Sequence, residues 1–180
     1  MHTKPTSFAT GHHQTTLCGT ITIGIDPGYT GAIAVFSGGY PKTVYDMPVI
    51  KIGKRTELDE MGLFAIFDNL IFESNFPGSV FAYVEKAQTM PGQGIASTGR
   101  YLVGYGQILG MLAGLRIPKT LVHPRTWKAA MMRDMPKEKG ASVLRCQQLW
   151  PEFAAENLKL KKHHGRADSL LIGFWGVKHG

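Results

Sequence analysis

Acidic residues are scarce in this chain. Its 180 residues include 13 Asp and Glu against 20 Lys and Arg, which gives a formal net charge of +7 and a pI of about 9.5. A basic excess of this kind favours a polyanionic partner, nucleic acid first, although an ordinary basic soluble protein has the same balance. Because acids are few, those that stand among apolar residues become the first candidates for function.

Cysteines are few, and long apolar runs are absent from the sequence. Cys18 and Cys146 have neither metal-ligand spacing nor the partners of a disulfide framework, so we expect no structural zinc cluster and a reducing compartment. No apolar run is long enough to span a bilayer. Residues 1–20 contain no acid, no Arg and no apolar core of a secretory signal. We expect a disordered N-terminal tail there and one domain over 21–180.

The apolar patterns predict an α/β protein, and the hydrophobic content of 43% supports a real core. Short links between the first three strands indicate antiparallel hairpins. The order of elements favours a mixed five-stranded sheet flanked by helices on both faces. The expected strands are 21–26, 32–36, 43–47, 79–85 and 119–123, and the expected helices are 57–73, 97–115, 124–134, 138–149 and 165–177.

Three acids stand in apolar settings far apart in the sequence. Asp26 ends one apolar run at a Pro-Gly turn, Glu85 ends another, and Asp168 lies within an apolar helical segment. An unpaired carboxylate is costly in such a place, so the three suggest one shared cation site. Hard carboxylate oxygens suit Mg²⁺, and two ions about 3.5–4 Å apart would serve in-line phosphodiester cleavage. Simpler explanations are a turn cap for the first acid and ion pairs for the others, with Lys86, Arg100 or Arg166.

Several motifs, in matching order and spacing, resemble those of the RuvC-like Holliday junction resolvases in their compact phage and prophage form. They are GIDPGYTGAIA at 24–34, VEKAQTMPGQG at 84–94, HPRTWK at 123–128, KEKGAS at 137–142 and HHGRADSLLIG at 163–173. The resemblance implies a ribonuclease H-like fold in which strands 21–26 and 79–85 lie side by side. That arrangement would bring Asp26 and Glu85 together, with Asp168 approaching from the last helix.

The same resemblance implies a metal-dependent endonuclease that cleaves branched DNA, resolving four-way junctions by paired nicks during recombination or DNA processing. It implies Mg²⁺ as cofactor, two ions per site, with Mn²⁺ as a possible substitute. It also implies a homodimer, because a four-way junction offers two symmetric strands to cut. The expected location is the cytoplasm of a bacterial cell or of a phage-infected host.

The fourth metal ligand is where this chain departs from the family pattern. Relatives place an acid or His three residues before the last Asp, and here that position is Gly165. We therefore expect His164 to be the ligand or proton-transfer group, with His163 second. The alternative is that both histidines flank a helix start and contact phosphate.

Basic and amide side chains close to the acidic motifs in sequence are the expected DNA-binding residues. Lys128 is the candidate catalytic base near the scissile phosphate, whereas the preceding Trp127 reads as a core residue. Gly106, Gly110 and Gly114 lay a smooth stripe along one helix face, which needs close packing against the sheet or against another subunit. The other expected DNA-binding residues are Lys86, Gln88, Gln93, Arg100, Arg125, Lys161, Lys162 and Arg166.

Two other classes of protein fit parts of the sequence. The DPGYTG turn also resembles the phosphate-binding turn of actin-like and sugar-kinase folds, but those have two lobes and a second Gly-rich adenosine motif, which is not found here. A non-catalytic DNA-binding relative is the other alternative. The three acids, all present, argue against it.

Overall fold

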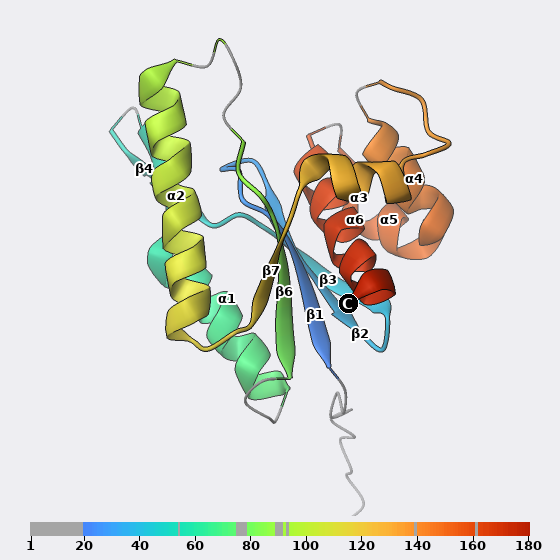
Figure 1. Cartoon of the computed structure of the whole chain (residues 1–180), viewed down its shortest axis with the longest axis horizontal. Coiled ribbons are helices and arrows are strands. Elements are labelled where there is room, and N and C mark those ends of the chain that lie inside the picture. The colour runs from blue at the N-terminus through green and yellow to red at the C-terminus, as the bar shows by residue number, and fades with distance from the viewer. Residues whose placement is uncertain are drawn as a thin grey trace, which may run out of the picture.

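The fold is built around one five-stranded sheet (Figure 1). The computed structural model describes residues 20–53, 55–74, 79–88, 92, 94–138, 140–160 and 162–180. The strand order is β3-β2-β1-β6-β7; β1, β2 and β3 pair antiparallel, whereas β6 and β7 run parallel to β1. A separate hairpin pairs β4 with β5. The strands are β1 Ile21–Asp26, β2 Ala32–Ser37, β3 Tyr40–Asp46, β4 Val49–Ile52, β5 Arg55–Leu58, β6 Val80–Glu85 and β7 Lys119–Val122.

Helices cover both faces of the sheet. Figure 1 shows α1 and α2 on one side and α3 to α6 on the other. One buried cluster, which includes Phe67 and Ile108, joins the sheet to α1 and α2, and a second, which includes Trp127 and Leu170, joins it to the remaining helices. The helices are α1 Glu60–Glu73, α2 Ile95–Gly114, α3 Pro124–Met131, α4 Ala141–Leu149, α5 Pro151–Asn157 and α6 His164–His179.

α6 lies against β1 at backbone contact distance. A Cβ atom on Gly24 in β1 would stand 2.2 Å from the backbone nitrogen of Gly173 in α6, which is far inside van der Waals contact. Any larger residue at Gly24 would therefore push the helix away from the strand. This close approach sets how near Asp168, five residues before Gly173, comes to the end of β1.

The predicted architecture is confirmed in its main features. The five-stranded mixed sheet, the two antiparallel hairpins at its start and the helices on both faces are all present. The first strand and the 79–85 strand lie side by side in parallel, as the family resemblance implies. The predicted tail, residues 1–20, lies outside the described residues except for Thr20.

The helix expected over 57–73 is wrong at its start. The side chain of Asp59 accepts a hydrogen bond from the backbone N–H of Gly62 at 2.9 Å, so this residue caps α1 and the helix begins after it. The residues before the cap form the β4–β5 hairpin, which the prediction lacks. Its strands are short and mostly exposed, so they carry no strong apolar alternation. Its turn uses Gly53 at a φ of +62°.

The prediction also lacks α5. Pro151 stands in the first turn of this helix, where a missing N–H costs nothing, so the residue that seems to end α4 begins a new helix. Smaller differences concern boundaries. The helix expected over 124–134 ends at Met131, the one over 138–149 begins at Ala141, and the strand over 43–47 begins at Tyr40.

The glycine stripe of α2 faces outward. A Cβ atom added to Gly106, Gly110 or Gly114 would meet no other atom within 4 Å. Packing of this stripe against the sheet, one of the two expected explanations, is therefore wrong. Across the described residues, no helix is both long and apolar enough to cross a membrane.

Candidate active site

Asp26 and Glu85 end two neighbouring parallel strands. In the register of β1 and β6, Ile25 pairs with Val84, so the next residue of each strand places an acid at the same edge of the sheet. The negative charge of Glu85 raises the pKa of Asp26, in addition to larger effects described below. The strand pairing therefore brings two of the three predicted acids into electrostatic contact.

The carboxylate of Asp26 is poorly accommodated as an anion. Its Oδ1 accepts a hydrogen bond from the backbone N–H of Gly28 at 3.2 Å, which is the turn cap of the simpler explanation. Burial nevertheless raises the pKa of Asp26 from 3.8 to about 7, and the charges of Asp168 and Glu85 add to this effect. Capping the turn requires only Asp26 and does not explain why two more acids lie nearby, whereas a bound cation would offset the repulsion between the three carboxylates.

Asp168 approaches the strand ends from the first turns of α6. The helix can start so close because Gly165 packs on the β1–β2 turn: a Cβ atom there would lie 2.2 Å from the carbonyl oxygen of Thr30. Burial raises the pKa of Asp168, while a hydrogen bond from Ser142 lowers it. Oδ1 of Asp168 is buried and has no hydrogen-bond partner among the described residues.

Glu85 is held by a neighbour from α3. Its Oε2 accepts a hydrogen bond of 2.6 Å from the indole Nε1–H of Trp127, a residue with no exposed surface. Burial raises the pKa of Glu85, and this hydrogen bond together with the charge of Lys128 opposes that rise. The ion pair with Lys86 or Arg100 that the simpler explanation supposes is absent among the described residues.

Lys128 lies within electrostatic reach of all three acids. Its charge lowers the pKa of Asp26, Glu85 and Asp168 alike. Its Nζ stands 5.1 Å from the centre of the Trp127 ring, where the ring face attracts a cation. The structure thus brings together four of the predicted catalytic residues.

The two histidines have different surroundings. His164 is the first residue of α6, one turn before Asp168, and its charge lowers the pKa of that acid. The Nδ1 atom of His164 is buried without a hydrogen-bond partner among the described residues. His163 is buried, and its Nδ1 accepts a hydrogen bond from the backbone N–H of Leu160 at 3.4 Å. Only His164 therefore keeps a buried ring nitrogen unsatisfied beside an acid.

The donor set fits a hard divalent cation. Asp168 and His164 each have a buried polar atom without a hydrogen-bond partner among the described residues, and the pKa of Asp26 stands near 7. A bound cation would compensate for both features. No three acidic, histidine or cysteine side chains of the described residues stand close enough to enclose an ion by themselves. Mg²⁺ usually keeps several waters and takes one or two protein carboxylates, so an open arrangement of this kind suits it.

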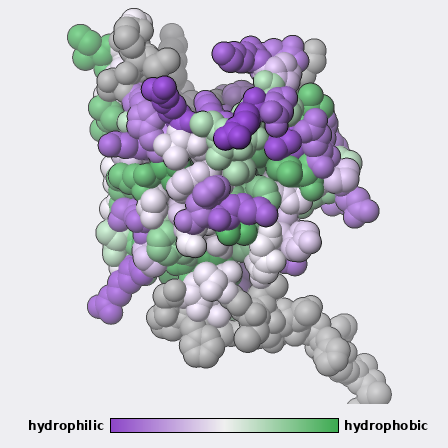
Figure 2. Space-filling model, turned by 45° about the vertical axis from the view of Figure 1, so that its right-hand side comes forward, coloured by the Kyte–Doolittle hydropathy of each residue, from purple (hydrophilic) through white to green (hydrophobic). Residues whose placement is uncertain are grey.

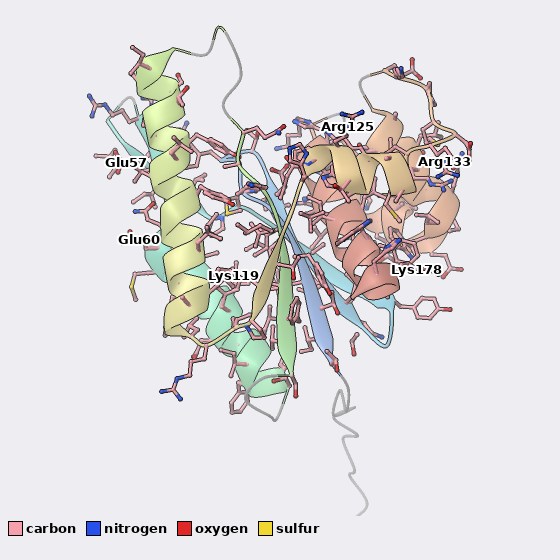
Figure 3. The ribbon with its side chains drawn as sticks, in the orientation of Figure 1. Glu57, Glu60, Lys119, Arg125, Arg133 and Lys178 are labelled. Atoms are coloured by element: carbon pink, nitrogen blue, oxygen red, sulfur yellow. The ribbon has the colours of Figure 1, made fainter. Side chains whose placement is uncertain are left out.

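Most of the predicted DNA-binding side chains lie on the surface. Lys86, Gln88, Arg100, Arg125 and Lys162 are exposed, and Nε2 of Gln88 lies 2.7 Å from Nε2 of His123. Figure 3 shows Arg125 at the end of the molecule where α3 begins, with Glu57 and Glu60 on the opposite side beside α2. Gln93 and Lys161 lie outside the described residues.

Arg166 contacts the protein itself. Its Nε and Nη2 donate to the two carboxylate oxygens of Asp46 at 2.6 and 2.7 Å, and its Nη1 donates to the carbonyl oxygen of Asn157 at 3.0 Å. The guanidinium holds the pKa of Asp46 below its usual value. Arg166 therefore joins the end of β3 and the end of α5 to the start of α6.

Four residues of the site are not assigned to it by the sequence analysis. Trp127 and His123 stand in the HPRTWK motif, and Ser142 closes the KEKGAS motif, so each had a signal in its neighbours. Tyr101 in α2 had none. Burial, with the charges of Glu85 and Asp26, raises the pKa of Tyr101 to about 12, which brings α2 into the site's surroundings.

The chain is similar in sequence to a known resolvase. Over 101 residues the chain is 34% identical to the chloroplastic Holliday junction resolvase MOC1 of Chlamydomonas reinhardtii. The match covers 56% of this chain but only 11% of the relative's length. No family profile matches the chain.

The chain is also similar to solved structures. RuvC of Thermus thermophilus in complex with a Holliday junction substrate superposes with a TM-score of 0.54 at 15% identity, covering 88% of this chain and 96% of that one. A second structure of Thermus thermophilus RuvC gives a TM-score of 0.49 at 17% identity, with 86% and 91% covered. The chain therefore has the ribonuclease H-like fold of RuvC and resembles a Holliday junction resolvase in sequence.

Proposed function

We propose that this protein is a metal-dependent endonuclease that cleaves branched DNA and resolves four-way junctions by paired nicks. The observation that carries the proposal is the meeting of Asp26, Glu85 and Asp168, from three separate elements, at one edge of the sheet. The name of the similar protein, a Holliday junction resolvase, supports the choice of substrate. We further propose that it acts in the cytoplasm of a bacterial cell or phage-infected host, where its few cysteines stay reduced.

Asp26, Glu85 and Asp168, with His164, are the residues that would hold the metal. Two Mg²⁺ ions are the expected cofactor, and Mn²⁺ is the expected substitute. When bound, divalent ions in such a site supply an activated water and neutralise charge on the phosphate. The protein itself holds the three acids together at the strand ends and leaves the buried Oδ1 of Asp168 without a hydrogen-bond donor among the described residues.

Lys128 is the protein group best placed to receive the scissile phosphate. Its ammonium reaches the three acids electrostatically yet the side chain is exposed, so it can also contact a ligand. A lysine in this position binds a phosphate oxygen and keeps the backbone of the DNA beside the acids. The ring of Trp127 beneath the ammonium limits the directions that the lysine can take.

The proposed DNA surface surrounds this edge. It comprises Lys86, Gln88, Arg100, Arg125 and Lys162, all of them exposed, and Gln93 and Lys161 are proposed members outside the described residues. Figure 2, in which the side covered by α3 to α6 comes forward, shows hydrophilic side chains over the upper half of that face. Arg166 is left out, because Asp46 and Asn157 already bind its guanidinium.

We also propose a homodimer that uses the outer face of α2. Val103 lies 60% exposed beside the stripe of Gly106, Gly110 and Gly114, and Ile95 lies 93% exposed at the start of the helix. An open glycine stripe next to exposed apolar side chains favours close contact with another helix. Two copies related by a twofold axis would match the two strands cut in a junction.

The test is cleavage of an end-labelled four-way junction, compared with a linear duplex of the same sequence, in Mg²⁺ and in EDTA. The proposal expects paired nicks in the junction with Mg²⁺, none in EDTA, and little cleavage of the linear duplex. Tight junction binding without cleavage in Mg²⁺ or Mn²⁺ would instead identify a non-catalytic DNA-binding relative. Equal cleavage of both substrates would keep the nuclease but remove the junction as its preferred substrate.

A further inference from the structure

The two oxygens of Glu85 have unequal surroundings. Oε2 accepts the indole N–H of Trp127 at 2.6 Å, and among the described residues that indole is the sole hydrogen-bond donor to this carboxylate. In the part of the chain that the structure describes, no side chain or backbone donor reaches Oε1. A carboxylate oriented through one oxygen keeps its other oxygen clear of hydrogen bonds and open to a ligand.

The indole is locked where it stands. Trp127 has no exposed surface and belongs to the buried cluster that joins α3 to the sheet and to α6. The helix that carries it follows β7 directly, and Val122 at the end of β7 pairs with Glu85 at the end of β6. The backbone N–H of Lys86 also donates to the carbonyl oxygen of Val122 at 2.8 Å. The donor and its acceptor are thus tied together through the sheet as well as through the side chains.

An indole is suited to this task because it donates a single hydrogen bond, accepts none and does not titrate. It cannot compete with Glu85 as a metal ligand, and it carries no charge that would weaken binding of a cation. Next to it, the Nζ of Lys128 stands over the face of the Trp127 ring, 5.1 Å from the ring centre. Two consecutive residues of α3 therefore serve the same acid, one as a neutral donor and one as a charge.

We propose that Trp127 is a positioning residue of the metal site: its indole N–H holds Oε2 of Glu85 and leaves Oε1 as the oxygen available to a cation. The inference rests on the proposed function, because it supposes that Glu85 binds metal. Hydrogen-bonding partners of metal-binding carboxylates fix their orientation, and losing one weakens metal affinity or activity by about 10–100-fold.

The test removes the N–H without changing the shape of the ring. In the full chain, Trp127 is replaced by benzothienylalanine, in which sulfur stands for the Nε1–H group, and the same replacement at Trp150 is the matched control. Trp150 lies in the same buried cluster, packed edge-on against Phe36 and Phe174, away from Glu85. Mn²⁺ affinity is measured by electron paramagnetic resonance, junction affinity in EDTA by gel shift, and folding by thermal melting.

The expected result is a Mn²⁺ affinity about 10–100-fold weaker for the Trp127 replacement alone. Its melting temperature and its junction affinity in EDTA should match those of the control, and 7-azatryptophan, which keeps the N–H, should restore metal binding. Wild-type Mn²⁺ affinity in the benzothienylalanine protein would overturn the proposal.

A second readout follows the hydrogen bond directly. The chain has three tryptophans, so its indole N–H groups give three NMR signals. The Trp127 signal, identified by its loss on replacement, should move when Mg²⁺ is added, while those of Trp150 and Trp175 stay in place. If Glu85→Gln weakens metal binding but the Trp127 signal does not shift when Mg²⁺ is added, Trp127 does not position Glu85, although Glu85 still binds the metal. If the wild-type protein binds no metal, the positioning role and the proposed function fail together.

Discussion

Asp26→Asn should stabilise the protein when no metal is present. The folded-state pKa of Asp26 is about 7, against an ordinary value of 3.8, so the folded protein binds this proton more tightly than the unfolded chain does. The contribution of Asp26 to the free energy of unfolding therefore falls as the pH rises from about 4 to about 7, and the full cost is present above that range. Asn keeps the oxygen that accepts the Gly28 N–H but carries no charge to desolvate.

The size of the effect follows from the shift. One pKa unit corresponds to about 1.4 kcal/mol, so the cost of ionising Asp26 at about pH 8 is at most about 4 kcal/mol. For a domain of this length each kcal/mol changes the melting temperature by about 2–4 °C, so the full cost of about 4 kcal/mol would raise the melting temperature of the variant by about 8–16 °C. Relaxation of the site and entry of water will reduce this figure.

The assay is thermal melting in EDTA between about pH 4 and pH 8, with Asp68→Asn, a change of an exposed acid on α1, as the control. The advantage of Asp26→Asn should be largest at the alkaline end and vanish near pH 4. Added Mg²⁺ should then stabilise the wild-type protein more than the variant, because a ligand stabilises the state that binds it. If the variant melts with the wild type at about pH 8, or if its advantage does not shrink on acidification, the account of Asp26 is wrong.

Three further outcomes are expected. His164→Ala should lower the cleavage rate strongly with partial recovery in Mn²⁺, which tolerates looser ligation than Mg²⁺, while His163→Ala should cost only a modest loss of binding; the opposite pattern in single-turnover rates would reverse the assignment. Lys128→Ala and Arg125→Ala should each flatten the salt dependence of junction binding by about one unit of slope, whereas Lys119→Ala, at the far end of β7, should not; unchanged slopes would mean that neither side chain contacts phosphate. Arg166→Ala should lower the melting temperature by freeing Asp46 and Asn157 while the salt slope stays as in wild type, and a flattened slope would return this residue to the DNA surface.

The sheet could be predicted from the sequence because its strands have strong apolar patterns. The apolar runs ending at Asp26 and Glu85 are buried on both faces, so their period and their ends were readable, and the short turns between the first three strands allowed only hairpins. The β4–β5 hairpin was not predicted because its side chains are mostly exposed, and exposed strands need no apolar alternation. α5 was not predicted because a proline such as Pro151 can end one helix or begin the next, and the local sequence does not decide between these two positions.

The site was readable only in part, for a different reason. Acidic and basic residues are recognisable in a sequence by their charge, so Asp26, Glu85, Asp168 and Lys128 could be selected without a structure. The side chains that form hydrogen bonds or ion pairs with charged residues could not be predicted, because those contacts depend on tertiary packing. The indole that binds Glu85 looks like any buried aromatic residue in sequence, and the partner of Arg166 lies 120 residues away at Asp46.

Asp26, Glu85 and Asp168 should form a site for cleavage and not for DNA binding. Single-turnover cleavage and binding of the same labelled four-way junction, in Mg²⁺, can be measured with wild-type protein, Asp168→Asn and Glu85→Gln at saturating concentration. Both variants should bind the junction as the wild type does and leave it uncut. A variant that cuts at the wild-type rate would remove its residue from the active site, and if both variants did so, the three acids would not form a cleavage site.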